Sequence, residues 1–389
     1  MPLPLRDRDF EKILLIKLSA LGDVVQTVPV LNKLRRRYPA ARIDWLTTPG
    51  MAELLRHNPA INTVLEFSRD SWSAPWRLAP FVSAARLAAA IRRARYDLVL
   101  DLQGQFRSAV FARLSGAPAR VGFDKPRPEM WAASSRKFPP EARRHAWQGA
   151  REGSWLAYTN PIAVPNIDVH AVDRYLAVGA MLGLADGPAD FSFPIPKQAV
   201  TRIDALLDYY DIAKAKLIAI APGTIWDTKQ WRGEGFAEAA RHFLKNGYAV
   251  TLVGAERERA VCAAVATAAP GCVNLAGKTT VSELAALLAR TTLVLTNDSG
   301  PMHLAVALGR PVIAVFGPTD PIWAGPYRRD GAVLRVELPC SPCYLRQLSR
   351  CPHDHACMKN ISAATVIAHS DAMLRSAEKA RARAQAGRY

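Results

Sequence analysis

The sequence predicts an α/β protein made of two Rossmann-like halves, and three observations lead to this prediction. Short apolar runs alternate with stretches of helical periodicity along most of the 389 residues. Such alternation is typical of buried parallel strands whose connections are helices. A chain of this length fits two domains better than one, and the proline-rich stretch at 185–198 (ADGPADFSFPIPKQ) is the best candidate for the linker between them.

The first half begins with an apolar run, KILLIKL, which predicts a buried strand. The following DVVQTVPVLNKLRRRYP has an apolar face and a basic end, which indicates a helix. Residues 125–165 have no clear periodicity and are predicted to form a long loop, whereas 170–184 again predicts a helix. The strands predicted in this half are 12–18, 41–49, 96–104 and 119–123.

The second half repeats the pattern and ends in ISAATVIAHSDAMLRSAEKARARAQAGRY, which predicts a basic amphipathic helix with a frayed tail. We therefore expect an N-terminal domain over 1–190, a C-terminal domain over 191–365, and a C-terminal helix and tail over 366–389. The strands predicted in this half are 216–223, 248–255, 272–277, 292–300 and 311–317, and each but the third ends in a loop that contains glycine.

The charge of the chain is strongly positive, with 51 Lys and Arg against 34 Asp and Glu and a net charge of +17. The excess is spread over both halves, which favours an anionic partner such as a membrane surface or a phosphorylated substrate; an arginine-rich genome is the alternative explanation. Nucleic acid is an improbable partner, because the sequence lacks the aromatic stacking motif of an RNA-binding module. No apolar run reaches the ~18 residues of a membrane span, and the N-terminus lacks the apolar centre of a secretory signal. We expect a cytoplasmic protein.

The stretch LTNDSGPMHLAVALGRPVIAVFG places polar residues where a strand meets a helix. Ligands of parallel α/β sheets bind beyond the carboxyl ends of strands, and the free N–H groups of a helix N-terminus bind anions. We expect Asp298, Ser299, Gly300 and His303 to form a phosphate site, most simply for a pyrophosphate. The alternative is an ordinary helix cap followed by a buried histidine.

Two other strand ends carry polar residues that suit a nucleotide. In APGTIWDTKQW, Thr224 and Thr228 offer hydroxyl groups and Lys229 offers a cation for phosphate; the alternative is a plain surface turn. In LVGAERERA, Glu256 follows a strand and suits ribose hydroxyls; the alternative is a carboxylate at a helix start.

The first strand end, KLSALGDVVQTVP, contains a glycine and a carboxylate. Here Gly22 is predicted to make the turn and Asp23 to open the helix. Asp23 is either an acid that favours the helix dipole or, facing a cleft, a general base. No G-x-G-x-x-G follows this strand, which disfavours a nicotinamide or flavin site, and GKTT at 277–280 lacks the earlier glycine of a P-loop.

Several segments together resemble the ADP-heptose:lipopolysaccharide heptosyltransferases, glycosyltransferase family 9. The resemblance implies GT-B architecture, in which two Rossmann-like domains face each other across a cleft, with the acceptor in the N-terminal domain and the nucleotide sugar in the C-terminal one. The segments are ILLIKLSALGDVVQTVPVLNKLRRRYP, DLVLDLQGQFRSAVFARLSGAPARVGF, HAVDRYL, APGTIWDTKQW, LVGAERE and NDSGPMHLAVALGRPVIAVFGPTDP.

The resemblance also implies a reaction. It is the inverting, metal-independent transfer of heptose from ADP-heptose to lipid A that carries 3-deoxy-manno-octulosonate (Kdo), at the inner face of the inner membrane. HAVDRYL favours the first heptosyl transfer. Another nucleotide sugar or a protein acceptor is the alternative.

The resemblance alone implies roles for the residues that match the family's motifs. Asp23 matches the proposed base. Arg107, and less closely Arg120, lies where a basic residue faces the acidic acceptor. The donor is matched by Lys229 and Thr224 at its phosphates, Glu256 at its ribose, and Asp298, Ser299, Gly300 and His303 at the donor turn.

Four cysteines lie close together in LPCSPCYLRQLSRCPHDHACMKN, near His353 and His355. Such clustering in a cytoplasmic protein favours a structural zinc or iron over a disulfide, although reduced thiols are an open alternative. A branch of the family that modifies autotransporter proteins is known for a cysteine-bound iron. The four are Cys340, Cys343, Cys351 and Cys357, whereas Cys262 and Cys272 are predicted to be core residues.

Overall fold

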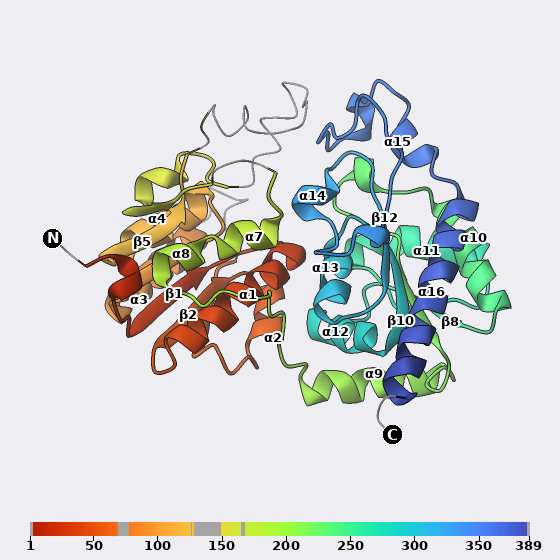
Figure 1. Cartoon of the computed structure of the whole chain (residues 1–389), viewed down its shortest axis with the longest axis horizontal. Helices are drawn as coiled ribbons and strands as arrows, with labels where there is room; N and C mark the ends of the chain where they lie inside the picture. The colour runs from red at the N-terminus through yellow and green to blue at the C-terminus, as the bar shows by residue number, and fades with distance from the viewer. Residues whose placement is uncertain (1–2, 69–77, 126, 128–148, 165–167, 387–389) are drawn as a thin grey trace. The chain divides into compact units, whose positions relative to one another are not determined.

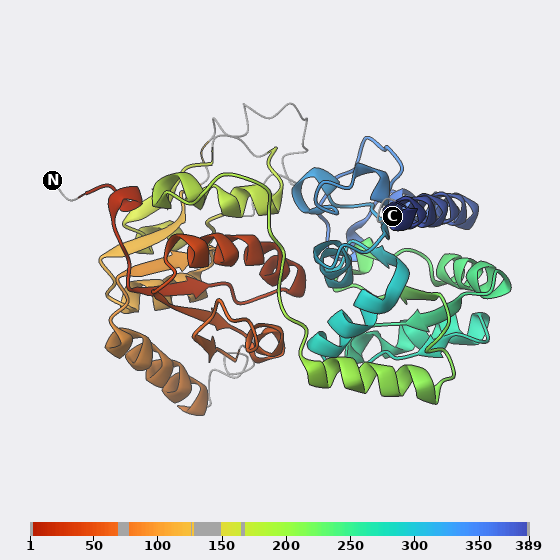
Figure 2. The same cartoon turned by 60° about the horizontal axis from the view of Figure 1, so that its bottom comes forward.

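The computed structural model describes residues 3–68, 78–125, 127, 149–164 and 168–386 (Figure 1). The chain packs as two compact units that join along the sequence at Pro194 and Ile195. Each unit contains one parallel sheet with helices on both sides of it (Figures 1 and 2). Among the described residues, no helix is both long and apolar enough to cross a membrane.

The sheet of the N-terminal unit has six parallel strands in the order β3-β2-β1-β4-β5-β6 among the described residues. The chain moves outward from β1 to β3 and then returns to the other side of β1 at β4. The carboxyl ends of β1 and β4 therefore form the topological switch point, where ligands of such sheets bind. The strands are β1 (Lys12–Ile16), β2 (Arg42–Thr47), β3 (Thr63–Glu66), β4 (Leu98–Asp101), β5 (Ala119–Phe123) and β6 (Asn160–Ile162).

The helix predicted after the first strand is confirmed as α1 (Leu21–Arg37), whereas the single helix predicted over 170–184 forms two helices, α7 (Ala171–Leu176) and α8 (Val178–Leu182). α1 has Asp23 in its first turn and arginines in its last turn, so charges complement the helix dipole at both ends. The described helices are α1 (Leu21–Arg37), α2 (Pro49–Leu55), α3 (Leu78–Ala94), α4 (Phe106–Leu114), α7 (Ala171–Leu176) and α8 (Val178–Leu182), with short 3-10 turns η1 (Leu5–Asp7) and η3 (Ser154–Ala157).

The prediction of a continuous loop over 125–165 was wrong at its end, where η3 and β6 form. β6 pairs with β5, and Tyr158 just before it packs its ring against Gly122 of β5. A Cβ at Gly122 would lie 2.4 Å from that ring, so the close approach requires glycine. This strand is short and lacks an apolar period, which is why periodicity could not find it. Residues 126, 128–148 and 165 of the predicted loop lie outside the described residues.

The sheet of the C-terminal unit has the order β12-β11-β10-β7-β8-β9, again with six parallel strands in the described chain. Its switch point lies between the carboxyl ends of β7 and β10. The strand predicted at 272–277 is reduced to two residues. The strands are β7 (Leu217–Ala221), β8 (Ala249–Leu252), β9 (Val273–Asn274), β10 (Thr291–Asn297), β11 (Val312–Val315) and β12 (Val333–Leu334).

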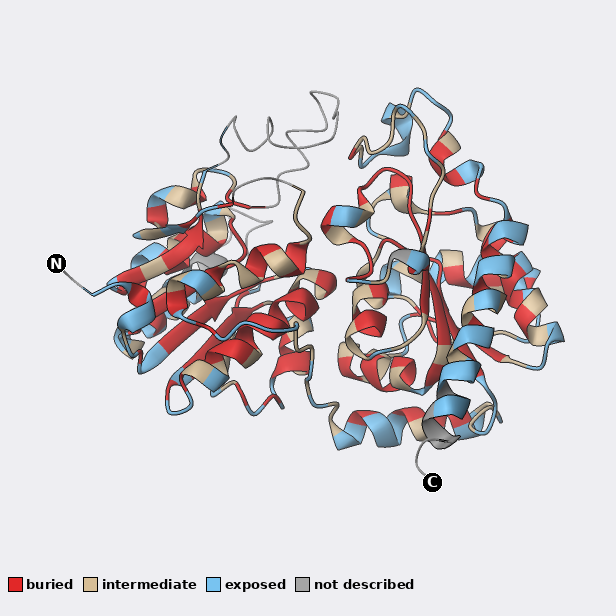
Figure 3. Cartoon of the chain, in the orientation of Figure 1, coloured by how far each residue is buried: buried red, intermediate tan, exposed pale blue. Residues whose placement is uncertain are grey.

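The core of this unit is formed by the buried strands and by aromatic residues that include Trp231, Phe236 and Phe243 (Figure 3). The C-terminal helix α16 belongs to the same unit and contacts α10, β10 and β11. The helices are α9 (Lys197–Tyr209), α10 (Gly233–Lys245), α11 (Arg259–Ala268), α12 (Val281–Arg290), α13 (Gly300–Ala307), α14 (Pro321–Ala324), α15 (Ala356–Lys359) and α16 (Ala363–Ala386); the 3-10 turns are η4 (Asp227–Lys229), η5 (Glu256–Glu258), η6 (Asp330–Ala332) and η7 (Leu348–Arg350).

Candidate active site

The switch point of the N-terminal unit contains a buried lysine. Lys17 directly follows β1 and its side chain is only 3% exposed. Its Nζ donates hydrogen bonds to the carbonyl of Leu102 and to the hydroxyl of Tyr175, each at 2.8 Å. Burial lowers the pKa of Lys17, and the nearby carboxylate of Asp23 opposes that shift.

Asp23 lies beside this lysine in the first turn of α1. Its Oδ1 accepts a 2.7 Å hydrogen bond from the Tyr175 hydroxyl and lies 3.5 Å from Lys17 Nζ, while its Oδ2 accepts from the Ala20 amide at 3.2 Å. The side chain is 37% exposed, so the carboxylate is both fixed and open to solvent. Burial raises the pKa of Tyr175, with Asp23 adding to the shift, so Tyr175 is a neutral hydrogen-bond donor.

Sequence reasoning missed Lys17 and Tyr175. Lys17 had a visible signal, because a cation stands inside the apolar run KILLIKL. Tyr175 is 152 residues from Asp23 and reaches it only because α7 packs against α1. The predicted turn at Gly22 was also wrong, since α1 begins at Leu21 and Gly22 is a helical residue.

Residues at the carboxyl end of β4 form hydrogen bonds with the loop that precedes Asp23. The side-chain oxygen of Gln103 accepts from the amides of Leu18 and Ser19 at 2.9 and 3.3 Å. Asp101 is buried, which raises its pKa, and it accepts from the Tyr158 hydroxyl at 2.9 Å and from the Gln103 amide at 3.0 Å. These bonds connect β1, β4 and η3 into one support for the Asp23 loop.

The two predicted acceptor arginines have different surroundings. Arg107 lies in the first turn of α4 and is partly exposed. The guanidinium of Arg120 donates to the carbonyls of Ala157 and Ala117 at 2.7 and 2.6 Å, and its burial lowers its pKa. Arg120 is also partly exposed, but its guanidinium is occupied in holding the backbone around β5 together, so Arg107 is the better candidate to face a ligand.

In the C-terminal unit, two residues predicted from separate motifs are in contact. Lys229 Nζ lies 2.6 Å from Asp298 Oδ2, and this carboxylate also accepts from the Thr319 hydroxyl at 2.7 Å. Lys229 is held over the ring of Trp226, 4.3 Å from its centroid. Asp298 is 5% exposed and Lys229 is 16% exposed, so the ion pair is largely shielded from water.

Asn297, which the sequence analysis missed, connects the loops that carry this pair. Its Nδ2 donates to the Pro222 carbonyl at 2.9 Å, and its Oδ1 accepts from the Trp231 amide at 3.0 Å. The side chain thus ties the end of β10 to both ends of the loop that contains Lys229. Its signal in the sequence was its place as the last residue of a buried strand.

The turn predicted to bind the donor is the N-terminus of α13. Ser299 is the N-cap residue, with its hydroxyl 2.9 Å from the Thr296 hydroxyl, and Gly300 begins the helix. The Gly300 amide lies at the switch point, where it can bind an anion. Pro301 has no N–H, and the Met302 amide donates to the Ser299 carbonyl at 3.2 Å. His303 follows in the same turn and is partly exposed.

The remaining donor candidates differ in accessibility. Thr224 is partly exposed at the switch point. Thr228 is 2% exposed and its hydroxyl donates to the carbonyl of Leu345, so this hydroxyl is occupied within the protein. Glu256 is exposed in η5, where it pairs with Arg259 at 2.7 Å.

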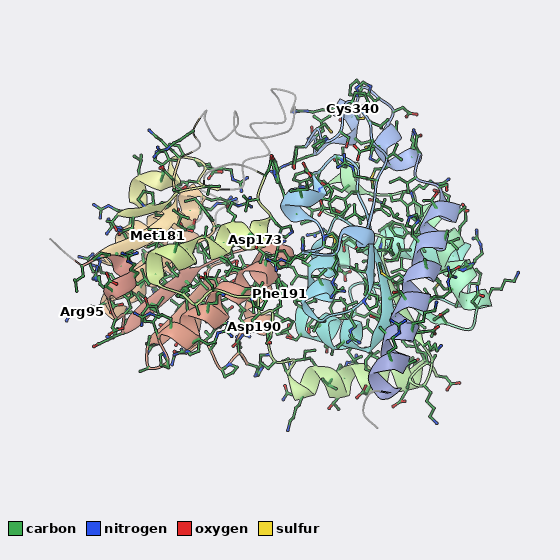
Figure 4. All side chains as sticks on the ribbon, viewed as in Figure 1. Arg95, Asp173, Met181, Asp190, Phe191 and Cys340 are labelled. Carbon is green, nitrogen blue, oxygen red and sulfur yellow. The ribbon has the colours of Figure 1, made fainter. Side chains whose placement is uncertain are left out.

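The four clustered cysteines lie within one segment of the C-terminal unit, and Figure 4 shows Cys340 in the loops beside α15. Burial raises the pKa of Cys357 to about 12, and the neighbouring thiols add to that shift. All four are free thiols. In the described parts of the chain, no three His, Cys, Asp or Glu side chains converge closely enough to hold a metal ion, so these residues do not fit a metal site in this conformation.

Two parallel α/β units with polar residues at their switch points are typical of GT-B glycosyltransferases. The solved structure of Escherichia coli ADP-heptose LPS heptosyltransferase II matches with a TM-score of 0.71 and 23% identity, covering 94% of this chain and 99% of that one. The predicted fold class, an α/β protein with GT-B architecture, is confirmed.

The chain belongs to glycosyltransferase family 9 (heptosyltransferase), whose family model matches residues 84–149 and 138–352. Lipopolysaccharide heptosyltransferase 1 of Pseudomonas aeruginosa is 29% identical over 342 residues, covering 85% of this chain and 86% of that protein. Lipopolysaccharide heptosyltransferase 2 of Salmonella typhimurium is 27% identical over 338 residues, covering 84% and 88%. The resemblance seen in the sequence is confirmed: the protein is a glycosyltransferase of the lipopolysaccharide heptosyltransferase family.

An iron-containing member of the same fold also matches. The dodecameric glycosyltransferase TibC from enterotoxigenic E. coli has a TM-score of 0.53 and 15% identity, covering 96% of this chain and 78% of that one. TibC, which contains iron, thus has a fold similar to that of this chain.

Proposed function

We propose that the protein transfers heptose from ADP-heptose to Kdo-lipid A, with inversion at the anomeric carbon, as a heptosyltransferase I does. The observation that carries the proposal is the Asp23 carboxylate, fixed by Tyr175 at the switch point of the N-terminal unit yet open to solvent. The choice of the first heptosyl transfer rests on HAVDRYL, the motif that contains Tyr175. Another nucleotide sugar or a protein acceptor is the alternative.

The proposed chemistry begins with Asp23 as the general base. It takes the proton from the acceptor hydroxyl, whose oxygen then forms a bond to the anomeric carbon of heptose. The bond from this carbon to the ADP oxygen breaks on the opposite side, so the configuration inverts. Tyr175 and Lys17 act as positioning residues, because the Tyr175 hydroxyl donates to one oxygen of Asp23 and Lys17 donates to that hydroxyl.

We assign the stabilisation of the leaving ADP to the C-terminal unit. Lys229 and the Gly300 amide at the start of α13 offset the negative charge that develops on the diphosphate. Ser299, Gly300 and His303 line this turn, and Asp298 orients Lys229 through their ion pair. Thr224 is the remaining hydroxyl candidate for phosphate, because the hydroxyl of Thr228 is occupied.

The sugar and acceptor contacts complete the proposal. Glu256 is assigned to the ribose hydroxyls. To bind them, Glu256 must open or rotate its ion pair with Arg259. Arg107 is assigned to the acidic acceptor. The net charge of +17 supports peripheral binding to the anionic cytoplasmic face of the inner membrane, since each Lys or Arg near such a surface contributes ~1 kcal/mol.

The test is incubation with ADP-heptose and defined acceptors, read by mass spectrometry. We expect Kdo-lipid A to gain one heptose, and we expect no gain on an acceptor that already carries the first heptose. GDP- and UDP-linked sugars serve as donor controls. Transfer only to a heptosylated acceptor or to a peptide would contradict the assignment, as would transfer from another nucleotide sugar alone.

Removing the Tyr175 hydroxyl tests whether it positions Asp23. Tyr175→Phe is expected to lower kcat by about tenfold, because a hydrogen bond to a charged group contributes roughly 1.5–3 kcal/mol. The acid limb of the pH–rate profile should move to higher pH, since a donor that favours the ionised carboxylate is gone. The measurement is kcat against pH for both proteins.

Tyr96→Phe is the matched control for this variant. It also removes a buried hydroxyl that donates to an aspartate, Asp44, in the same unit. It should lower the thermal midpoint without moving the acid limb. An unmoved acid limb in Tyr175→Phe would leave Tyr175 with a purely structural role.

We also propose that catalysis needs no metal, and that any zinc or iron at Cys340, Cys343, Cys351 and Cys357 is structural. The iron content of TibC supports a metal in this fold. Thiolates would have to converge to ~2.3 Å from the ion, so the segment must tighten on loading. A bound ion would join its two ends, and it would take no part in the transfer.

The expected result concerns protein purified without oxygen. It should contain about one equivalent of zinc or iron per chain, and the double variant Cys340→Ser with Cys343→Ser should lose the metal and thermal stability. The kcat of the folded fraction should not change. Elemental analysis without metal, together with four thiols that titrate freely, would reduce the cluster to ordinary reduced cysteine.

A further inference from the structure

The cysteine-rich segment at 338–360 is bonded to the loop that follows β11. The Ser341 hydroxyl donates to the Gly317 carbonyl at 2.6 Å, and the amides of Cys343 and Tyr344 donate to the Pro318 carbonyl at 3.0 and 2.8 Å. This loop continues to Thr319, the residue that hydrogen-bonds Asp298. The segment therefore supports one side of the Lys229–Asp298 pair.

The same segment is also bonded to the loop that carries Lys229. His355 Nε2 lies 2.7 Å from the Thr228 carbonyl, and the Thr228 hydroxyl donates to the Leu345 carbonyl. These contacts bury Thr228, which directly precedes Lys229 in the chain. These contacts also fix the position of Arg346, the residue that directly follows Leu345.

Arg346 and Lys229 both lie against the ring of Trp226. Its Cζ lies 4.8 Å from the centroid of the Trp226 ring, and Lys229 Nζ lies 4.3 Å from the same centroid. Arg346 is exposed, and among the described side chains no carboxylate forms an ion pair with it. Lys229, in contrast, is already paired with Asp298.

This difference in charge decides which cation is available for an anionic ligand. The positive charge of Lys229 is largely compensated by Asp298, whereas that of Arg346 is not. A nucleoside diphosphate carries more than one negative charge, so one compensated lysine is a poor match for it. A guanidinium held against an aromatic ring keeps its N–H groups oriented and binds phosphate with two parallel hydrogen bonds.

We propose that Arg346, supplied by the cysteine-rich segment, binds the diphosphate of the nucleotide donor together with Lys229. The proposal rests on the proposed function, because it takes the end of β7 and the start of α13 as the donor site. It assigns the segment a second role besides support. The competing explanation is that Arg346 only stabilises Trp226 through their cation–π contact.

Calorimetric titration with ADP and AMP separates these two explanations. Arg346→Ala is expected to weaken ADP binding by about tenfold, as the loss of one charge-assisted hydrogen-bonded contact implies. AMP, which lacks the second phosphate, should lose clearly less. Arg346→Lys should recover part of the ADP affinity, because it restores the charge without the planar fork.

Arg350→Ala is the matched control, since Arg350 is an exposed arginine of the same segment at the end of η7. It should bind both nucleotides as the wild type does. Thermal midpoints of all variants show whether the segment remains folded. Equal losses for ADP and AMP, or no loss at all in a wild type that binds ADP, would overturn the role of Arg346 and leave the proposed function standing. A wild-type protein that does not bind ADP would overturn both.

Discussion

Asp23→Asn is expected to keep its affinity for ADP-heptose and to lose about 10²–10⁴-fold in turnover, the usual contribution of a general base. The amide has the shape of the carboxylate and can still accept the hydrogen bond from the Tyr175 hydroxyl, so α1 and α7 should keep their packing. What the amide cannot do is take a proton from the acceptor. The measurement is kcat with Kdo-lipid A, together with donor affinity by calorimetry.

Asp97→Asn is the matched control for this variant. Asp97 accepts from the amides of Glu11 and Lys12 at 2.8 and 3.1 Å, near the amino end of β1 and so at the opposite end of that strand from Asp23. It should lower stability and leave the turnover of folded protein unchanged. A near wild-type rate in Asp23→Asn would remove Asp23 from the mechanism.

The fold could be predicted from the sequence because both sheets are buried on two sides. A strand such as Ile13–Ile16 must then be apolar throughout, and this run is visible without any knowledge of its neighbours. The strands that were missed, β3, β6 and β12, and the strand that was overestimated, β9, lie at the sheet edges, where one neighbour is enough and the apolar run is short. Their pairing depends on tertiary contacts that no local pattern records.

Residues of the candidate site could be predicted where a polar side chain comes shortly after a buried strand. Lys229 and Asp298 were both selected in this way, although nothing local indicated that they form an ion pair. Tyr175 was missed because its role requires α7 to pack on α1. Thr228 looked available because its hydroxyl lies near Lys229 in sequence, yet a carbonyl 117 residues further along the chain occupies it.

The structure explains why loss of Lys229 should have a larger effect than loss of one surface cation. Lys229→Ala removes a charge beside the departing diphosphate, and it also leaves Asp298, which is 5% exposed, without its partner at 2.6 Å. An unpaired carboxylate there would repel the diphosphate. We therefore expect ADP affinity to fall by about 10–100-fold, and turnover to fall by about 10²–10³-fold, as for the loss of a preorganised electrostatic contact.

The double variant Lys229→Ala with Asp298→Asn separates these two causes. Removing the carboxylate should restore part of the ADP affinity, because the repulsion disappears while the missing cation does not return. It also guards against misfolding, since breaking a buried pair destabilises more than replacing both partners. Lys278→Ala, which changes an exposed lysine of the same unit, should behave as the wild type. If Lys229→Ala instead matched the wild type in both ADP affinity and rate, the diphosphate would have to bind elsewhere. The pair would then only join the loops after β7 and β10.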